Sequence, residues 1–131
     1  MDIRKVTLAN EDYFRVVSQS PWSQVAVMCI KTVDHGIARE FHSVSEQSFY
    51  VEAGSALINF TNPQNRQSST VHLQAGQMVD VPPGVYHDVV KLDTVDLKMW
   101  TRYSPPNPEH YMGEVKRRNP NSVSSKENAQ V

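Results

Sequence analysis

Short apolar runs separated by turn-forming residues recur along the middle of the chain. Residues 23–32 are almost continuously apolar and rich in β-branched side chains, which lose χ1 freedom in a helix, so this run predicts a strand buried on both faces. Residues 47–51 alternate, with Phe49 and Val51 on one face, as in a strand whose two faces differ. Similar runs predict further strands at 39–43, 56–60, 71–73, 78–81, 86–92 and 97–103.

Glycine and proline mark the turns between these runs. Gly54 follows one predicted strand, and the Pro-Pro-Gly sequence at 82–84 is a rigid turn before another. Prolines within 104–108 end the last run because proline has no N–H to donate to a neighbouring strand. The polar residues 61–70 are predicted to form a surface loop. Seven or eight short strands with no convincing helix predict an all-β antiparallel sandwich or barrel of the jelly-roll type.

The two ends of the chain lack this strand pattern. Residues 1–22 mix charged and apolar positions without a sustained period, so we expect an irregular arm with one short strand before a barrel spanning 23–112. Residues 113–131 contain the basic run 116–118, which we interpret as solvated charge, and then mostly Ser, Asn, Lys and Glu. This composition predicts a polar, flexible tail, without site chemistry beyond about residue 118.

Composition restricts the partners and the compartment. The 131 residues suit a single domain, and a formal net charge of −1 gives no reason to expect nucleic acid or an acidic membrane surface as a partner. No apolar run approaches the ~20 residues of a membrane span or resembles a secretory signal. The single cysteine, Cys29, cannot form an internal disulfide, so we expect the cytoplasm or another reducing compartment.

Two separated segments carry side chains that could donate to one point. Glu40 and His42 are two residues apart and would share one face of a strand, and Gln47 follows five residues later. His87 comes directly after the Pro-Pro-Gly turn. Oxygen and nitrogen donors on two hairpins predict a metal pocket between them.

These segments resemble the two sequence motifs of the cupin superfamily. The second motif keeps every spacing at Gly76, Pro82, Gly84 and His87, although Lys91 stands where the pattern has Asn. In the first motif Glu40 and His42 occupy the two His positions, Gln47 occupies the Glu position and Gly54 closes it, while Gly36 is displaced. This resemblance implies the double-stranded β-helix (jelly-roll) barrel.

A narrower group is similar over about residues 6 to 115, the small single-domain cupins labelled mannose-6-phosphate isomerase-like. They typically carry Glu-x-His, four residues and then Gln, and residues 10–17 and 97–106 resemble their start and ending. Asp88 and Lys91 depart from the Asn residues usual after the His. The label describes similarity, so it implies fold, pocket and metal but leaves the reaction open.

The resemblance implies Glu40, His42, Gln47 and His87 as ligands of one divalent metal ion. Two nitrogens and two oxygens suit Fe, Mn, Zn or Ni, with coordination positions left for substrate. A three-ligand site is an alternative, because the neutral amide of Gln47 donates less electron density than a carboxylate. In the other alternative Glu40 and His87 form a hydrogen-bonded pair in an empty or apolar pocket.

Other side chains have weaker claims on function. His110 follows the proline-rich exit and either covers the barrel mouth as a lid or acid/base, or lies in a loosely packed surface segment. Four aromatic residues either line a ligand cavity or belong to the core: Tyr86, Tyr103, Trp100 and Phe49. His35 and His72 are expected in solvent, and Cys29 is expected to act as a small buried hydrophobe.

Two functional hypotheses follow. The first is a metal-dependent enzyme of small-molecule metabolism, which acts on a sugar or oxo-acid in an isomerase-like or oxygenase-like reaction. The second is a non-catalytic module that uses the same pocket to bind a small ligand or to assemble. An acid/base group such as His110 or a tyrosine beside the metal would favour the enzyme. Short edge strands and the N-terminal arm also predict a homodimer.

Overall fold

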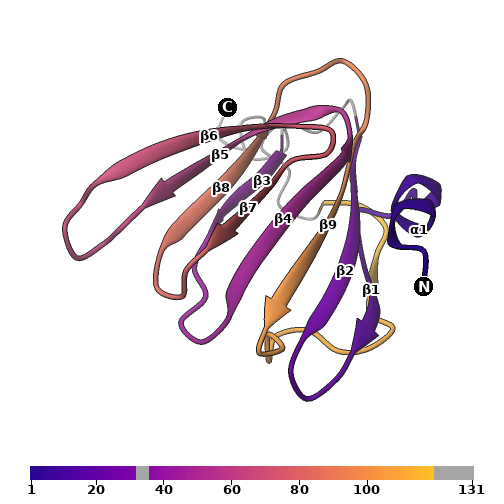
Figure 1. Ribbon diagram of the computed structural model, residues 1–131, viewed down its shortest axis with the longest axis horizontal. Coiled ribbons are helices and arrows are strands. Elements are labelled where there is room, and N and C mark those ends of the chain that lie inside the picture. Colours follow the sequence, from indigo (N-terminus) through magenta and orange to yellow (C-terminus); the bar gives the residue numbers. More distant parts are fainter. Residues whose placement is uncertain (32–35, 120–131) are drawn as a thin grey trace, which may run out of the picture.

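The protein is built almost entirely from strands in two antiparallel sheets (Figure 1). The computed structural model describes residues 1–31 and 36–119. The larger sheet has the strand order β10 (Val115–Lys116), β1 (Phe14–Gln19), β2 (Gln24–Ile30), β9 (Leu97–Ser104), β4 (Glu46–Ala53) and β7 (Met78–Val81). The smaller sheet has the order β3 (Gly36–Glu40), β8 (Tyr86–Lys91), β5 (Ser55–Thr61) and β6 (Ser68–Gln74). The predicted all-β class is confirmed.

Most predicted strands lie within two residues of their expected bounds, and two differ. The strand expected at 39–43 is β3, which ends at Glu40. The polar loop expected at 61–70 is shorter, because Thr61 pairs with Ser68 and extends the β5–β6 hairpin. Backbone pairing can continue through polar residues where both faces meet solvent, and apolar alternation does not reveal such strands.

The N-terminal segment contains a helix, so the expected irregular arm is wrong there. Helix α1 spans Ile3–Ala9, and its N-cap Asp2 accepts a hydrogen bond from the Lys5 N–H at 3.1 Å. Lys98 of β9 donates its Nζ hydrogen to the carbonyl of Leu8 at 2.7 Å, which ties the helix to the larger sheet. A seven-residue helix is too short to show a helical period in the sequence. The expected short strand is β1.

Residues 113–119 are part of the fold, which corrects the expected tail for this stretch. β10 pairs with β1, and Glu114 is buried. Asn119 is also buried and donates a hydrogen bond from Nδ2 to the Gly36 carbonyl at 2.8 Å. Composition could not reveal this, since β10 pairs with the distant strand β1 and Asn119 bonds to the distant Gly36. Residues 120–131 lie outside the described part.

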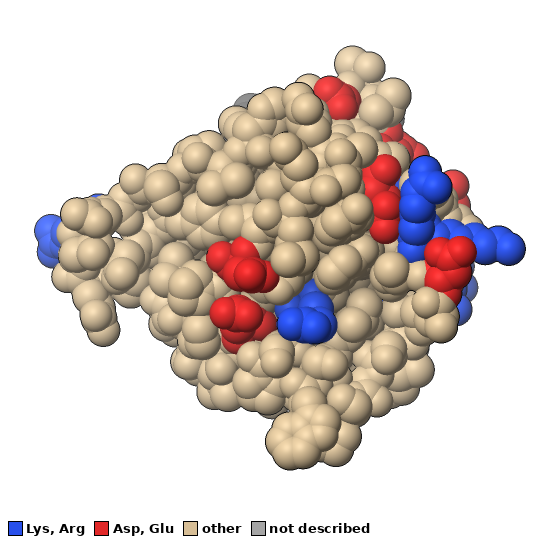
Figure 2. Space-filling model, viewed as in Figure 1, with Lys and Arg blue, Asp and Glu red and all other residues tan. Residues whose placement is uncertain are grey.

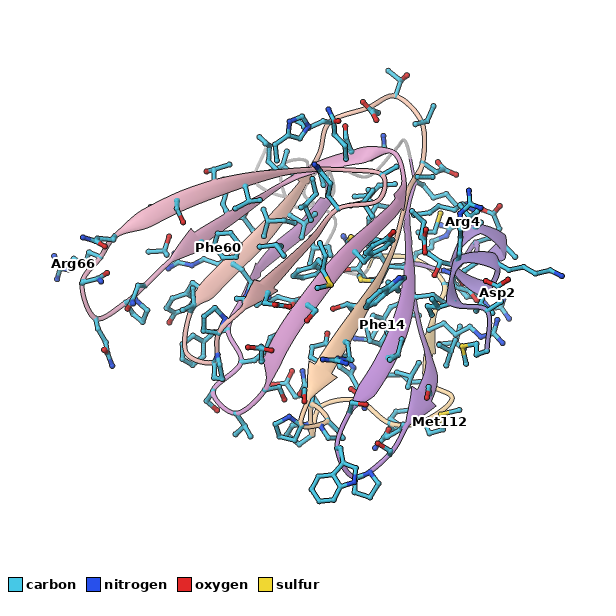
Figure 3. The ribbon with its side chains drawn as sticks, viewed as in Figure 1. Asp2, Arg4, Phe14, Phe60, Arg66 and Met112 are labelled. Atoms are coloured by element: carbon cyan, nitrogen blue, oxygen red, sulfur yellow. The ribbon has the colours of Figure 1, made fainter. Side chains whose placement is uncertain are left out.

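The core lies between the two sheets, where apolar side chains of both fill the space (Figure 3). The largest fully buried apolar side chains are Phe49, Ile30, Ile58, Leu73, Leu97 and Met99. Burying each contributes about 1.5–3 kcal/mol relative to exposure. β2 is buried along almost its whole length, as predicted, and Cys29 lies within it. Burial raises the pKa of the Cys29 thiol, which fits the predicted role of a small hydrophobe.

The surface offers no large field of one charge sign on the face shown in Figure 2, where acidic and basic side chains lie near one another. Within residues 1–31 and 36–119, the structure contains no helix of the length and apolar character needed to span a membrane. His72 is exposed on β6, as expected, and His35 lies outside the described residues.

Candidate metal centre and its cavity

Three of the predicted ligands meet at the end of β3. Glu40 is the last residue of β3 and pairs with His87 of β8, and His42 follows two residues later. Glu40 Oε2 lies 3.2 Å from His42 Nε2 and 3.8 Å from His87 Nε2. One ligand atom from each residue lies within 4.8 Å of the others. The expected convergence of the two segments is therefore observed.

A backbone hydrogen bond joins the two segments. The Gly84 N–H donates to the His42 carbonyl at 2.8 Å. Gly84 lies in the turn before His87 and has a backbone φ of +80°, a conformation that residues other than glycine rarely adopt. His42 lies beyond the end of β3, so the expected strand alternation does not place it beside Glu40. Instead, the loop that contains His42 is held in place by the hydrogen bond from Gly84.

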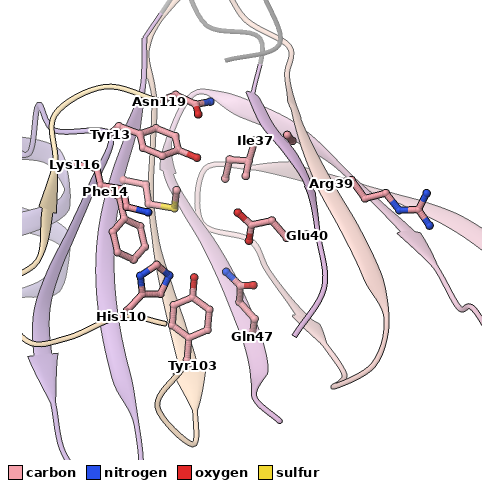
Figure 4. A pocket seen from close by; sticks show the side chains of 12 residues that line it. Tyr13, Phe14, Ile37, Arg39, Glu40, Gln47, Tyr103, His110, Lys116 and Asn119 are labelled. Carbon is pink, nitrogen blue, oxygen red and sulfur yellow. The ribbon is translucent and has the colours of Figure 1, made fainter. Parts of the chain in front are cut away.

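Gln47 approaches from the opposite sheet with a fixed amide. Its Nε2 donates to Thr101 Oγ1 at 2.9 Å, and Thr101 Oγ1 donates to the Ser48 carbonyl at 2.8 Å. Gln47 Oε1 is buried and has no hydrogen-bond partner within the described residues. Gln47 and Glu40 line the same cavity (Figure 4). The free amide oxygen is thus the atom that Gln47 offers to a ligand.

His87 holds a lone pair ready for a metal ion. Its Nδ1 lies 3.2 Å from the Val85 carbonyl, which can only accept, so Nδ1 carries the ring hydrogen. The buried Nε2 then has a lone pair and no hydrogen-bond partner within the described chain. An unsatisfied buried polar atom costs about 1–3 kcal/mol. A cation at this point would satisfy the atoms of both His87 and Gln47.

The electrostatics of the cluster favour a cation. Burial by itself raises the pKa of Glu40, but the hydrogen bond from His42 and the proximity of the His42 and His87 rings outweigh it and lower the pKa to about 2. Glu40 is therefore an anion at neutral pH. A carboxylate, an imidazole with a free lone pair and an amide oxygen fit a divalent transition metal, with His42 as the fourth donor.

A cavity of about 210 Å³ opens beside these ligands. Glu40 and Gln47 lie on one side of it, and Tyr103 and His110 lie on the other (Figure 4). His110 also packs against the ring of Phe14, with 4.4 Å between ring centroids. The cavity thus places His110 and Tyr103 opposite Glu40 and Gln47.

His110 is oriented by a buried carboxylate. Its Nδ1 lies 2.9 Å from Glu114 Oε1, and both side chains are largely buried. Because a carboxylate accepts, Nδ1 carries the hydrogen in the neutral ring and Nε2 keeps a lone pair. Glu114 was not predicted as a site residue, although its spacing of four residues from His110 was a signal in the sequence. His110 is not in a loosely packed surface segment.

The aromatic candidates divide into two groups. Tyr103 is buried at the cavity, and burial followed by the charge of Glu40 raises its pKa, so the phenol keeps its proton at neutral pH. Tyr86 does not line this cavity and packs instead against Phe41 and under the guanidinium of Arg39. Trp100 stacks on Tyr50 with 5.1 Å between ring centroids.

Comparison with known sequences gives two curated relatives. The uncharacterized protein L612 of Acanthamoeba polyphaga mimivirus is 32% identical over 126 residues, which cover 95% of this chain and 75% of the relative. The uncharacterized protein YrkC of Bacillus subtilis is 21% identical, over 97% of this chain and 67% of the relative. No family model matches the sequence.

Solved structures share the arrangement of strands. Protein BH2720 of Bacillus halodurans superposes with a TM-score of 0.81 at 26% identity and covers 89% of this chain and 86% of its own. A cupin-2 domain protein of Shewanella frigidimarina gives 0.57 at 22% identity, covering 75% and 86%. A double-stranded β-helix protein of Klebsiella pneumoniae gives 0.61 at 21% identity, covering 81% and 88%.

Two solved structures of proteins with individual names, KdgF and an oxalate oxidase, also have this fold. KdgF of a Halomonas species gives a TM-score of 0.62 at 16% identity, covering 73% of this chain and 80% of its own. An oxalate oxidase gives 0.59 at 16% identity, covering 66% and 43%. These likenesses show a shared fold. The chain therefore has the double-stranded β-helix fold of cupin domain proteins.

Proposed function

We propose that this protein is a metal-dependent enzyme that acts on a small sugar or oxo-acid metabolite, in an isomerase-like or oxygenase-like reaction. One observation carries the proposal. A single cavity has metal-ligating atoms of Glu40 and Gln47 on one wall and the oriented imidazole of His110 on the other. A module that only binds a ligand has no need of a proton acceptor held opposite a metal site.

The roles follow from the donors in the cavity. Glu40, Gln47 and His87 hold a divalent ion, with His42 as the fourth donor. When bound, the ion would polarise a carbonyl or enediol oxygen of the substrate. His110 accepts a proton from the substrate at Nε2, while Glu114 fixes the ring and stabilises the charge that develops on it. Tyr103 remains protonated and donates a hydrogen bond into the cavity.

The volume of the cavity supports a small substrate. The cavity has a volume of about 210 Å³. Pockets for drug-sized ligands span about 300–1,000 Å³. One protein with this fold is an oxalate oxidase, whose name indicates a small acid as its substrate. The mannose-6-phosphate isomerase-like label and its sugar class belong to the same proposal.

Assembly and location are part of the proposal as well. Edge strands β7 and β10 have four and two residues, and pairing two copies would protect the exposed edges of the sheets. We therefore infer a homodimer. The single cysteine is buried and has no disulfide partner, which supports a reducing compartment such as the cytoplasm.

The test separates metal binding from catalysis. Wild type, resupplied with Fe(II), Mn(II), Zn(II) or Ni(II), should bind about one equivalent by elemental analysis, and His87→Ala should bind little. Small sugar phosphates and oxo-acids are then screened for turnover. His110→Ala should bind metal as wild type does but lose turnover by about 10²–10⁴-fold, the usual contribution of a general acid or base. Metal and ligand binding without turnover on any compound would favour the non-catalytic module.

A further inference from the structure

Asn107 connects the metal ligands to the segment that carries His110. It is buried in the segment that connects β9 to β10. Its Oδ1 accepts the Glu109 N–H at 3.0 Å, and its Nδ2 lies 3.3 Å from His42 Nδ1. Its backbone carbonyl accepts the His110 N–H at 3.1 Å. Nothing in the sequence motifs includes this residue.

The hydrogen bonds fix which nitrogen of His42 carries the hydrogen. The backbone N–H of Glu109 can only donate, so it requires the oxygen of the Asn107 amide. The amide nitrogen must then face His42, and it can only donate, so Nδ1 of His42 accepts with its lone pair. In the neutral ring the hydrogen therefore sits on Nε2, which donates to Glu40 Oε2 at 3.2 Å.

This tautomer is the wrong one for a ligand atom at Nε2. A metal-ligating nitrogen needs its lone pair, and the other ring nitrogen normally donates its hydrogen to a carboxylate or a carbonyl. His87 meets this requirement through the Val85 carbonyl, whereas His42 faces an amide nitrogen. Two histidines of the same cluster are thus held in opposite tautomers.

We propose that Asn107 is a positioning residue that restrains metal affinity by holding His42 in its Nε2–H tautomer. The ion is held chiefly by Glu40, Gln47 and His87, and His42 joins when the Asn107 amide turns its oxygen toward Nδ1. That turn releases the N–H of Glu109, whose residue is exposed, so water can replace the lost acceptor. Ligation of the metal by His42 therefore depends on the orientation of the Asn107 amide and on its hydrogen bond with Glu109. The proposal rests on the metal site of the proposed function.

Asn107→Asp tests the proposal with almost no change in size. One carboxylate oxygen still accepts the Glu109 N–H, and the other now accepts a hydrogen from His42 Nδ1, which frees the lone pair of Nε2. Residues that orient a metal-binding histidine typically change metal affinity by 10–100-fold. We expect the dissociation constant of Zn(II) or Mn(II), measured by calorimetry on the full chain, to fall by about that factor.

A charge control and a direct reading of the tautomer accompany this variant. Ser43→Asp adds the same charge at an exposed position next to His42 in the chain, and it should change the dissociation constant by no more than about fivefold, as for an exposed charge pair. Nitrogen-15 NMR of EDTA-treated protein should show His42 as Nε2–H in wild type and as Nδ1–H in Asn107→Asp.

Each outcome decides the matter. An Nδ1–H His42 in wild type overturns the proposal, and this reading stands even if the variant fails to fold. Equal or weaker metal binding by Asn107→Asp, or an equal gain in Ser43→Asp, also overturns it while leaving a metal enzyme in place. If only Asn107→Asp binds metal, the role of Asn107 is supported and the metal enzyme proposed for wild type fails. If neither binds, both fail.

Discussion

At the scale of single residues, Glu40 is the negative centre of the candidate site. It contacts both histidines of the cluster and lies on the wall of the cavity opposite His110. Its low pKa means that the charge is present whenever the protein is folded near neutral pH. This charge both attracts a cation and contributes to the stability of the fold.

The first prediction concerns the pH dependence of stability. The pKa of Glu40 is about 2 in the folded protein, below its ordinary value of 4.5, so its ionisation contributes stability in full above about pH 5. That contribution is lost as the pH falls from 4.5 toward 2. The difference in unfolding free energy between wild type and Glu40→Gln, from denaturant titrations with EDTA, should therefore shrink over this range. The exposed Glu46→Gln is measured alongside as a control of the same chemical change, and a constant difference for Glu40→Gln would contradict the prediction.

The second prediction concerns Gln47. Gln47→Glu places a charged oxygen at the site, so it should bind divalent metal more tightly. Without metal it should be less stable by about 1–3 kcal/mol, because Thr101 then has two acceptors, the new carboxylate and the Ser48 carbonyl, for one hydrogen. Calorimetry and denaturant titration measure the two effects. Thr101→Val is the control that removes the amide anchor, together with the hydrogen bond to the Ser48 carbonyl, without adding a charge. Unchanged affinity in Gln47→Glu would remove Gln47 from the ligand set.

Only some residues of this site could be predicted from the sequence. Glu40, His42 and His87 were recognisable because a motif fixes their spacing, and the structure brings them together. Glu114 and Asn107 were not, because each acts by orienting a histidine through a contact that only the folded chain creates. Such orienting residues have no fixed type, since any well-placed acceptor or donor serves.

At the scale of elements, the strands were the most predictable feature. β7 begins and ends where the sequence indicated, because apolar alternation between turns is strong there. Helix α1 and strand β10 were missed. Helix α1 is stabilised by its N-cap and by the hydrogen bond from Lys98, and β10 is stabilised by pairing with β1. Neither interaction can be recognised from the periodicity of apolar residues in the sequence.

The third prediction distinguishes the two parts of the C-terminal segment. Ending the chain after residue 119 should leave melting temperature and metal content nearly unchanged, since residues 120–131 are too polar to offset the entropy of ordering. Ending it after residue 112 removes Glu114, the β10–β1 pairing and the Asn119 hydrogen bond to Gly36, so both stability and turnover should fall. Thermal denaturation, elemental analysis and an assay of turnover measure the effects. A large loss of either property in the longer variant would contradict the prediction.

At the scale of the whole molecule, both sheets are needed to form one site. Glu40 and His87 come from the smaller sheet, Gln47 from the larger, and His110 from the segment that leads to β10. The ligands are therefore close together only in the folded chain, and the two hairpins remain apart in the sequence. The site therefore requires that both sheets are folded.

The fourth prediction is that two copies associate. Sedimentation or light scattering across micromolar concentrations should give twice the 14.9 kDa of the chain, because a pair protects exposed strand edges. A monomeric mass over the whole range would contradict it. The measurement is made with and without metal, so that dimerisation is not confused with an effect of the ion.

The last prediction is that the metal stabilises the fold. A ligand that binds only the native state adds about 2.7 kcal/mol when its free concentration is about 100 times its dissociation constant. For a chain of this size, that change corresponds to a melting temperature higher by on the order of 10 °C. Chelation should remove this increment from wild type. His87→Ala should melt at the same temperature with and without metal, because it lacks the imidazole whose lone pair is free. If metal leaves the melting temperature of wild type unchanged, the pocket is a metal-free binding cavity.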